Sequence, residues 1–282
     1  MHNQGVSAGI PFEILLMDDA SDEQYKLQNR VLERLPFVQY YELEENIGRS
    51  RIRNQLAVKA RYDYLLYIDC DAEIISPNFI ANYVNYCYKD VICVGGTAYT
   101  PQKPSREYLL RWTIGVKRES ADAYHRSKHP NANFSTFNFL MDRDFFLKVC
   151  FNEKLIGYGH EDTLFSFDLL KHNVTIRHIE NPLRHIGAET GEETLRKCQQ
   201  GIRNIRTIVK FLNSDPLFIK SVSLLHWGHR IEAAHATPFF AWIYSRFHTL
   251  MERNLLGSHP QLFLFSLWKE SYFCYLEQKE RT

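Results

Sequence analysis

Short apolar runs alternate with amphipathic segments along the first third of the chain. The apolar runs at residues 12–17, 38–43, 64–68 and 91–94 are typical of strands that are buried on both faces. The segments between them, such as residues 23–35, have apolar side chains at helical spacing. Strands and helices therefore alternate with short connections, and this order predicts an α/β fold with a mostly parallel sheet flanked by helices.

The middle of the chain continues this pattern with one long interruption. Residues 101–130 are polar and broken, and a long segment of this kind in a compact domain usually serves function. Polar and apolar residues then alternate over residues 133–141, which predicts a half-buried strand. Helices are expected at 77–88, 108–112, 144–149, 161–172 and 189–212, and a strand at 174–179.

Aromatic segments at the end of the chain predict a C-terminal helical appendage. Pro238 and Pro260 mark the expected boundaries between its helices. We therefore expect a domain of residues 1–213, followed by an aromatic-rich helical segment of residues 214–282.

The composition argues against nucleic acid as a partner, because 34 Lys and Arg residues balance 33 Asp and Glu residues, for a net charge of +1. The six cysteines form no Cys-x-x-Cys pair, so we expect free thiols in a reducing compartment. No segment reaches the ~18 consecutive apolar residues of a membrane span, and the polar start resembles no signal peptide. These features predict a cytoplasmic protein, with peripheral contact to the inner face of a membrane left open.

Acidic residues follow two of the predicted strands at the point where each strand ends. Asp18 and Asp19 follow the first strand, and Asp69 and Asp71 follow the strand at residues 64–68. Ligands of an open α/β sheet bind at the carboxyl ends of its strands. Two aspartates there are hard oxygen ligands for Mg2+ or Mn2+, and a diphosphate on the same cation is the expected cargo. The alternative is that these acids only shape a turn and cap the next helix.

Two helix starts and one strand end carry further candidate residues. Arg53 follows a glycine-containing turn and lies near the beginning of a helix with an apolar stripe; alternatively it is a solvated helix charge. Glu161 and Asp162 open an amphipathic helix after two glycines, which allow a flexible approach to this pair of acids. Asp162 could serve only the helix dipole. His185 lies in a segment that leads to a glycine, and by itself it could be an ordinary strand-end histidine.

Four motifs together point to a known family. In order and spacing, these motifs resemble those of the inverting family 2 glycosyltransferases with the GT-A fold. They are the acids at Asp18 and Asp19, the turn at residues 46–54, the Asp-Cys-Asp motif at residues 69–71 and the Gly-His-Glu-Asp motif at residues 159–162. The resemblance covers roughly residues 12–204. It implies metal-dependent transfer of a sugar from a nucleotide-diphosphate sugar, a UDP-sugar in the first place. The acceptor would be a hydroxyl of a glycan or lipid-linked molecule, and the anomeric configuration would be inverted.

The resemblance also implies a role for each matching residue. The nucleotide-binding residues would be Asp18 or Asp19, Arg53 and Asp69. The metal ligands would be Asp71 and His185, and the general base would be Asp162. Candidate contacts to the acceptor or the donor sugar are His160, Glu161, Trp112 and Asn138.

The sequence departs from the family pattern at its start. Family members begin with an apolar strand that ends in a Pro-x-Tyr-Asn type turn, whereas Met1 lies where the helix after that strand is expected. In the family this strand lies between the strand ending at Asp18 and the strand ending at Asp69. We therefore expect that these two strands either leave a gap or close up, and that upstream codons encode the strand.

Two other functions remain open from the sequence. An apolar strand ending in Asp-x-Asp also resembles the nucleophile strand of haloacid-dehalogenase-type phosphatases, where Gly-Thr normally follows; here Ala72 and Glu73 follow. A non-catalytic nucleotide- or carbohydrate-binding relative is the other alternative, and turnover of a nucleotide-sugar would distinguish it. A P-loop enzyme is excluded because the chain has no Gly-Lys-Ser/Thr motif.

Overall fold

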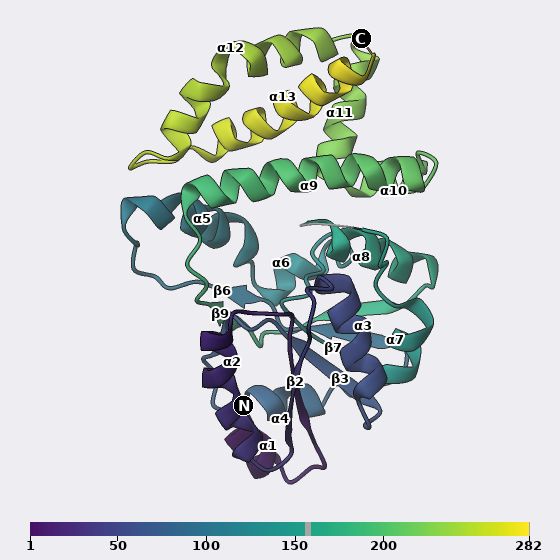
Figure 1. The fold of residues 1–282 in the computed structure, drawn as a ribbon. Coiled ribbons are helices and arrows are strands. Elements are labelled where there is room, and N and C mark those ends of the chain that lie inside the picture. The colour runs from purple at the N-terminus through teal and green to yellow at the C-terminus, as the bar shows by residue number, and fades with distance from the viewer. Residues whose placement is uncertain (156–158, 282) are drawn as a thin grey trace. The chain divides into compact units, whose positions relative to one another are not determined.

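The computed structural model describes residues 1–155 and 159–281, which form two compact units (Figure 1). Unit 1 contains Met1–Thr97, residues 122–155 and Leu164–Arg184. Unit 2 contains Ala98–Ala121, residues 159–163 and residues 185–281. The division into domains at residue 213 that the sequence suggests stays a prediction. No helix in the described part of the chain combines the length and the apolar character needed to span a membrane.

A four-stranded mixed sheet forms the centre of unit 1, in the order β3 (Tyr64–Ile68), β7 (Asn138–Asp142), β5 (Val91–Val94) and β8 (Thr175–His178). Strand β7 runs antiparallel to β3 and to β5, whereas β5 and β8 are parallel. The α/β fold is thus confirmed, with β7 as an antiparallel strand in the middle of the sheet.

Alternate residues of these strands face two different helical layers. Leu65 and Tyr67 of β3 share one apolar core with Phe139 of β7, and Leu66 packs into another. The first core is closed by α3 (Arg49–Lys59), α7 (Arg143–Val149) and residues 164–169 of α8 (Glu161–Lys171); the second is closed by α4 (Phe79–Val84). Both faces of the sheet are therefore covered, which explains why the strands of the sequence are continuous apolar runs.

The predicted half-buried strand at residues 133–141 is wrong in its position and its burial. Strand β7 begins only at Asn138, and all five of its residues are buried. The reason is that β7 pairs on both sides, with β3 and β5, between two helical layers. Three of the polar positions of the pattern, Asn133, Ser135 and Thr136, precede the strand.

A separate two-stranded parallel sheet pairs β1 (Ile14–Asp18) with β2 (Val38–Glu42). Among the described residues no hydrogen bond of either sheet joins β1 to β3, so these strands have not closed up. Helix α3 packs against β1, and α1 packs against α4. The other short elements are α1 (His2–Ala8), α2 (Glu23–Arg30), η1 (Val31–Arg34), α6 (Ala123–Ser127), and the three-stranded sheet of β4 (Ala72–Ile74), β9 (Leu183–His185) and β6 (Thr97–Ala98).

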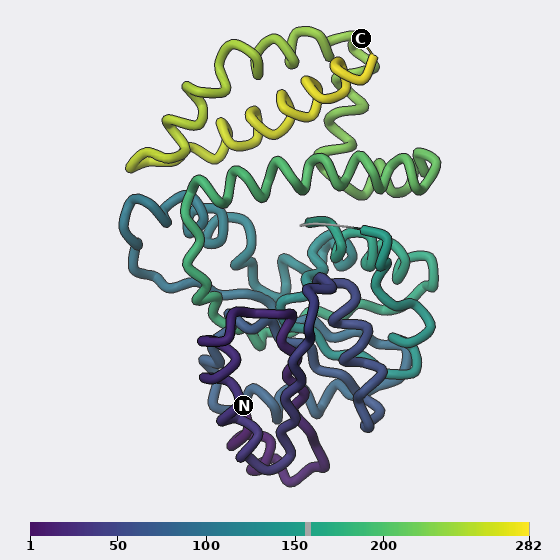
Figure 2. Tube along the Cα trace, in the orientation of Figure 1, coloured from purple at the N-terminus to yellow at the C-terminus, as the bar shows by residue number. Residues whose placement is uncertain are grey.

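Unit 2 is mostly helical, as the aromatic C-terminal sequence predicts. Its longest helix, α9 (Gly191–Phe211), begins with a capping box in which Thr190 and Glu193 bond each other's backbone N–H groups. Helices α12 (Thr237–Leu255) and α13 (Leu262–Arg281) form an antiparallel pair (Figure 2). Trp268 of α13 is fully buried. The remaining helices are η2 (Arg106–Tyr108), α5 (Leu109–Ile114), the π-helical turn η3 (Gly115–Glu119), α10 (Pro216–Ser221) and α11 (Ser223–Ala233).

Candidate active site

The two acids after β1 accept hydrogen bonds from their own turn and from the turn that precedes α3. Asp18 is buried, and its carboxylate accepts hydrogen bonds from the Ser21 N–H at 2.7 Å and the Tyr40 hydroxyl at 3.2 Å. Asp19 accepts the N–H groups of Ile47 at 2.7 Å and Gly48 at 3.0 Å. Asp18 therefore holds its own turn together, while Asp19 fixes the glycine-containing turn from which α3 begins.

Arg53 and Asp69, which lie apart in the sequence, are brought into direct contact. The Arg53 Nη2 donates to Asp69 Oδ1 at 2.9 Å, with 8% of the arginine side chain and 30% of the aspartate side chain exposed. The guanidinium lies 5.4 Å from the Phe151 ring centroid, and the Tyr67 hydroxyl donates to the Arg53 carbonyl at 2.8 Å. The buried arginine thus presents a fixed positive charge to the carboxyl end of β3.

The turn after β3 concentrates negative charge. The Ala72 N–H donates to the Asp69 carbonyl at 3.2 Å and closes a turn that contains Cys70 and the half-buried Asp71. The pKa of the Cys70 thiol is raised by desolvation and by the carboxylates of Asp71 and Asp69 on either side. A local excess of carboxylates at the end of a strand favours a cation.

The described residues contain no cluster of three or more His, Cys, Asp or Glu that would enclose a metal ion by itself. Mg2+ in nucleotide sites is usually held by one or two carboxylates together with substrate phosphates and water. Because Asp69 is engaged by Arg53, Asp71 is the carboxylate of this turn that fits such a role. The turn therefore suits a cation that arrives with a diphosphate better than a resident structural metal.

Asn138, a candidate sugar contact in the sequence, has a structural role instead. Its side chain is 1% exposed, and its Oδ1 accepts the Tyr83 hydroxyl at 2.5 Å. Its Nδ2 donates to the carbonyls of Asn181 at 2.9 Å and Gly96 at 3.3 Å. The amide is buried and its hydrogen bonds are made within unit 1, which argues against Asn138 as a sugar contact.

The candidate base lies in the first turn of α8. The Asp162 Oδ1 accepts the Thr163 N–H at 2.7 Å, and the Glu161 carboxylate accepts the Gly159 N–H at 3.1 Å. The His160 Nδ1 lies 3.1 Å from the Thr163 hydroxyl. Burial of the imidazole and the nearby Lys269 lower the pKa of His160 to about 4, so this histidine is neutral at pH 7.

A close approach of two backbones positions this segment within unit 2. Gly159 has a φ of +99°, and a Cβ added to it would lie 3.1 Å from the Gly201 Cα of α9. The Asn204 amide also donates to the Gly159 carbonyl at 3.4 Å. The backbone conformation therefore favours a glycine here, and the space for a side chain is tight.

The neighbourhood of His185 in unit 2 could not be read from the sequence. The His185 ring stacks on Tyr99 with a centroid distance of 5.3 Å. The Tyr99 hydroxyl accepts from Arg111 Nη2 at 2.6 Å and donates to Glu119. Burial and the Glu119 carboxylate raise the pKa of Tyr99. No local signal marks Tyr99, because its contact with His185 joins distant parts of the chain.

Trp112, the last candidate, is held by its indole nitrogen. The Nε1–H donates to the Thr100 carbonyl at 2.8 Å, and the side chain is half-buried in unit 2. Unit 1 thus brings together Arg53 and Asp69, with Asp71 in the same turn, and unit 2 carries Asp162 with its neighbours.

Comparison with known proteins agrees with this geometry. A family model described as glycosyl transferase family 2 matches residues 2–150, more than half of the chain. The chain belongs to this family. The matched residues include the acids after β1, the start of α3 and the Asp-Cys-Asp turn, so the family resemblance of the sequence is confirmed. The match does not support the phosphatase alternative. No curated protein matches the chain significantly.

Solved structures with little sequence identity are similar to the chain. The mannosyltransferase PcManGT from Pyrobaculum calidifontis, in complex with GDP-Man and Mn2+, is 12% identical over 95% of this chain and 77% of its own, with a TM-score of 0.59. TarS 1–349 from S. aureus is 15% identical over 99% and 86%, with a TM-score of 0.46. GalNAc-T7 with UDP, GalNAc and Mn2+ is 18% identical with a TM-score of 0.44; the match covers 63% of this chain and only 37% of GalNAc-T7. The first of these supports the GT-A fold, with a helical C-terminal part.

Proposed function

We propose that this glycosyltransferase moves a sugar from a nucleoside-diphosphate sugar to a hydroxyl of a glycan or lipid-linked acceptor, with inversion and with a divalent cation. The family match over residues 2–150 carries the proposal, because it includes the nucleotide and metal motifs. A UDP-sugar is the first donor to test. The relative of the same fold that was solved with GDP-Man and Mn2+ supports a nucleoside diphosphate and a divalent cation in general.

In this proposal unit 1 binds the nucleotide. Arg53, fixed by Asp69 and Phe151, offers a buried planar cation to the nucleobase. Asp69 is 30% exposed and keeps oxygen lone pairs for a ribose hydroxyl. Asp19 holds the turn at Ile47 and Gly48, so its role would be to shape the base pocket. The turn and the helix start would therefore present pre-arranged partners to the nucleotide.

Asp71 would hold the divalent cation, Mn2+ or Mg2+, through its carboxylate. When bound, the cation supplies positive charge that stabilises the departing diphosphate. Arg53 remains in its ion pair with Asp69, so it does not replace that charge. We further propose His185 as a contact to the cation or the diphosphate, with its ring orientation fixed by the stack on Tyr99.

Asp162 would act as the general base in a single displacement. The acceptor oxygen forms a bond to the anomeric carbon while the bond from that carbon to the diphosphate oxygen breaks. The diphosphate leaves with the electron pair, and the acceptor proton moves to the Asp162 carboxylate. One displacement inverts the anomeric configuration. The bond from the Thr163 N–H to Asp162 Oδ1 orients the carboxylate for this proposed role.

The neighbours of Asp162 would serve the acceptor side. Glu161 is tied to the Gly159 N–H, which fixes the loop before α8. His160 is neutral at pH 7 and pairs with Thr163, so we propose it as a positioning residue rather than a base. Trp112 would offer its half-buried ring face to a sugar, because its N–H is already engaged by Thr100.

A donor screen tests the proposal. The chain is incubated with Mn2+ and each nucleoside-diphosphate sugar in turn, and release of the nucleoside diphosphate is measured. Asp71→Asn should lower the release at limiting metal at least tenfold, because the variant loses one charge of a cation ligand. Asp63→Asn is the control, since Asp63 is exposed at the opposite end of β3. Normal turnover by Asp71→Asn would remove Asp71 from the metal site, and no turnover of any donor would favour a non-catalytic binding relative.

A further inference from the structure

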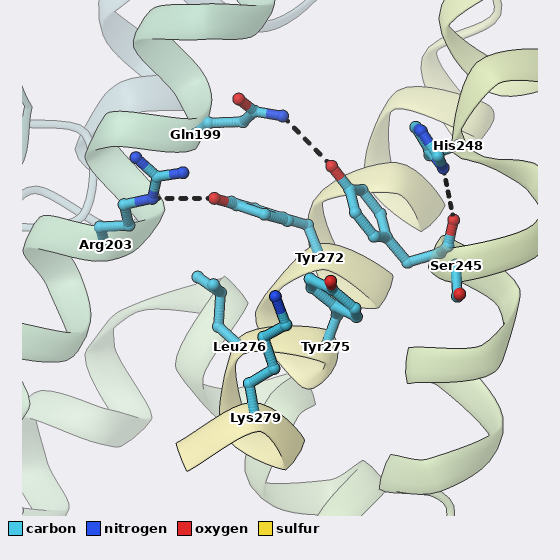
Figure 3. A pocket seen from close by; sticks show the side chains of 9 residues that line it. Gln199, Arg203, Ser245, His248, Tyr272, Tyr275, Leu276 and Lys279 are labelled. Atoms are coloured by element: carbon cyan, nitrogen blue, oxygen red, sulfur yellow. Dashed lines mark hydrogen bonds between the residues drawn. The ribbon is translucent and has the colours of Figure 1, made fainter.

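A polar pocket of about 360 Å³ lies within unit 2 between α9, α12 and α13. Gln199 and Arg203 extend from α9 toward tyrosines of the other two helices, and Lys279 lies at the end of α13 (Figure 3). Pockets of roughly 300–1,000 Å³ are of the size that takes small ligands. This pocket is not used by the proposed reaction.

The floor of the pocket is a rigid group of tyrosines. Tyr244 and Tyr272 are 8% and 4% exposed, and their ring centroids are 5.0 Å apart. Tyr275 lies 5.2 Å from Tyr244 and, with Leu276, supplies an apolar wall. Rings packed in this way are already ordered before a ligand binds, which reduces the entropy lost on binding.

The polar atoms of the floor are hydrogen-bond donors. The Gln199 Nε2 donates to the Tyr244 hydroxyl at 3.2 Å, and the Arg203 Nε donates to the Tyr272 hydroxyl at 2.9 Å. Among the described residues neither hydroxyl has an acceptor for its own proton. The His248 Nδ1 donates to the Tyr244 carbonyl at 2.9 Å, since a carbonyl can only accept. The pocket thus offers several O–H and N–H donors to a ligand.

The charge of the pocket is positive. Arg203 and Lys279 line it, and no Asp or Glu is among its lining residues. The carboxylates near the end of α13 are engaged elsewhere, since Glu277 pairs with Arg206 at 2.9 Å and Glu280 with Lys210 at 2.8 Å. Arg203 has no carboxylate partner in the part of the chain that the structure describes. In a protein with a net charge of only +1, this lining selects for an anion.

The pocket lies on a different face of α9 from the segment that carries the candidate base. Gly201 faces His160, with 3.6 Å between its potential Cβ and the imidazole. Gln199 and Arg203 are each two residues from Gly201, which is about 200° around the helix. A ligand in the pocket therefore contacts the opposite side of α9 from the Gly159–His160 segment.

We propose that this pocket is a separate binding site for an acidic saccharide, whose carboxylate or phosphate is held by Arg203, Lys279 and the tyrosine hydroxyls. The wall of Tyr275 and Leu276 suits the carbon face of a sugar ring, and the free O–H donors suit its oxygens. The proposal does not depend on the reaction proposed above, because it concerns binding without donor or metal.

Calorimetric titration of the full chain tests the site with four probes: trigalacturonic acid, glucose 6-phosphate, neutral maltotriose and inorganic phosphate. At least one acidic saccharide should bind, and maltotriose should bind at least tenfold more weakly. Arg203→Gln should weaken the acidic saccharide about tenfold or more, since a bond to a charged group is lost. Arg253→Gln should change it less than twofold, because Arg253 lies on α12 outside the pocket lining. The two acidic probes distinguish carboxylate from phosphate.

Several outcomes would overturn the site. These are no binding of either acidic saccharide, equal binding of maltotriose, or an unchanged affinity in Arg203→Gln. Inorganic phosphate binding as tightly as glucose 6-phosphate would mean an adventitious ion only. If Arg203→Gln does not fold, Tyr272→Phe takes its place, because it removes the hydroxyl and keeps the ring. Asp162→Asn should bind the acidic saccharide like the wild type, so failure of the proposed reaction leaves this test intact.

Discussion

Replacing Asp69 with asparagine tests whether the Arg53–Asp69 pair stabilises the candidate nucleotide site. The substitution keeps the shape of the side chain and an oxygen for the 2.9 Å bond from Arg53, but it removes the negative charge. Arg53 then remains as a cation with only 8% of its side chain exposed. Removing a negative charge that directly contacts a buried cation is destabilising, so Asp69→Asn should lower the free energy of unfolding.

The size of the effect follows from the exposure of the two partners. Breaking a fully buried pair costs about 3–5 kcal/mol, and breaking an exposed pair costs about 0–1 kcal/mol. Asp69 is 30% exposed, the asparagine oxygen still accepts a hydrogen bond, and the Phe151 ring still faces the guanidinium. We therefore expect an intermediate loss of about 2 kcal/mol.

The matched control is Glu73→Gln, which makes the same chemical change in an exposed pair of unit 1. Glu73 and Arg184 are 2.8 Å apart, with 47% and 36% of their side chains exposed, so the loss should be about 0–1 kcal/mol. Thermal and urea unfolding of both variants, followed by circular dichroism, measures the difference. Equal losses in the two variants would refute the argument from burial. Titration with UDP should also show weaker binding by Asp69→Asn alone.

Two further predictions concern the loop before α8. Gly159→Ala should cost about 1–3 kcal/mol from its φ of +99°, and its new methyl group, 3.1 Å from the Gly201 Cα, would also require a small shift of the backbone; the variant should reduce transfer. Gly9→Ala, with a φ of +64° and open space around the added Cβ, should cost less, and equal thermal shifts would refute the close approach. The folded-state pKa of His160, about 4, lies below the unfolded value of 6.5. The unfolded state therefore binds more protons between these values, and stability should fall as pH drops from about 6.5 to 4. His160→Asn, which tolerates the φ of +70°, should flatten this part of the stability profile, and an unchanged slope would contradict a buried neutral His160.

The sequence predicts the strands and their acids well, because local pattern determines both. Apolar runs mark β1, β2, β3 and β5, and the carboxyl end of a strand is a position that can be read directly from the chain. The predicted position and burial of the strand are wrong at β7, because the alternation of polar and apolar residues does not show that β7 pairs with a strand on each side. Burial of a strand on both faces depends on tertiary neighbours.

The candidate site is predictable only in part for the same reason. The contact of Arg53 with Asp69 agrees with the family resemblance, whereas the buried network of Asn138 and the stack of Tyr99 on His185 depend on residues far apart in sequence. The sequence does not distinguish a polar residue at a strand end that faces a ligand from one that faces the core. Burial and satisfied hydrogen bonds distinguish the two cases, and both require the folded chain.

Transfer by Asp162→Asn tests the central claim most directly. The variant and the wild type are incubated with the donor found in the screen, Mn2+ and an acceptor, and glycoside product and UDP affinity are measured in parallel. Asp144→Asn is the control, because Asp144 holds the same second position of the first turn in α7 as Asp162 does in α8. The account predicts that Asp162→Asn loses at least a hundredfold in transfer while its UDP affinity and the activity of the control stay at the wild-type level. Wild-type transfer by Asp162→Asn, or loss of UDP binding together with transfer, would contradict the claim that Asp162 is the base.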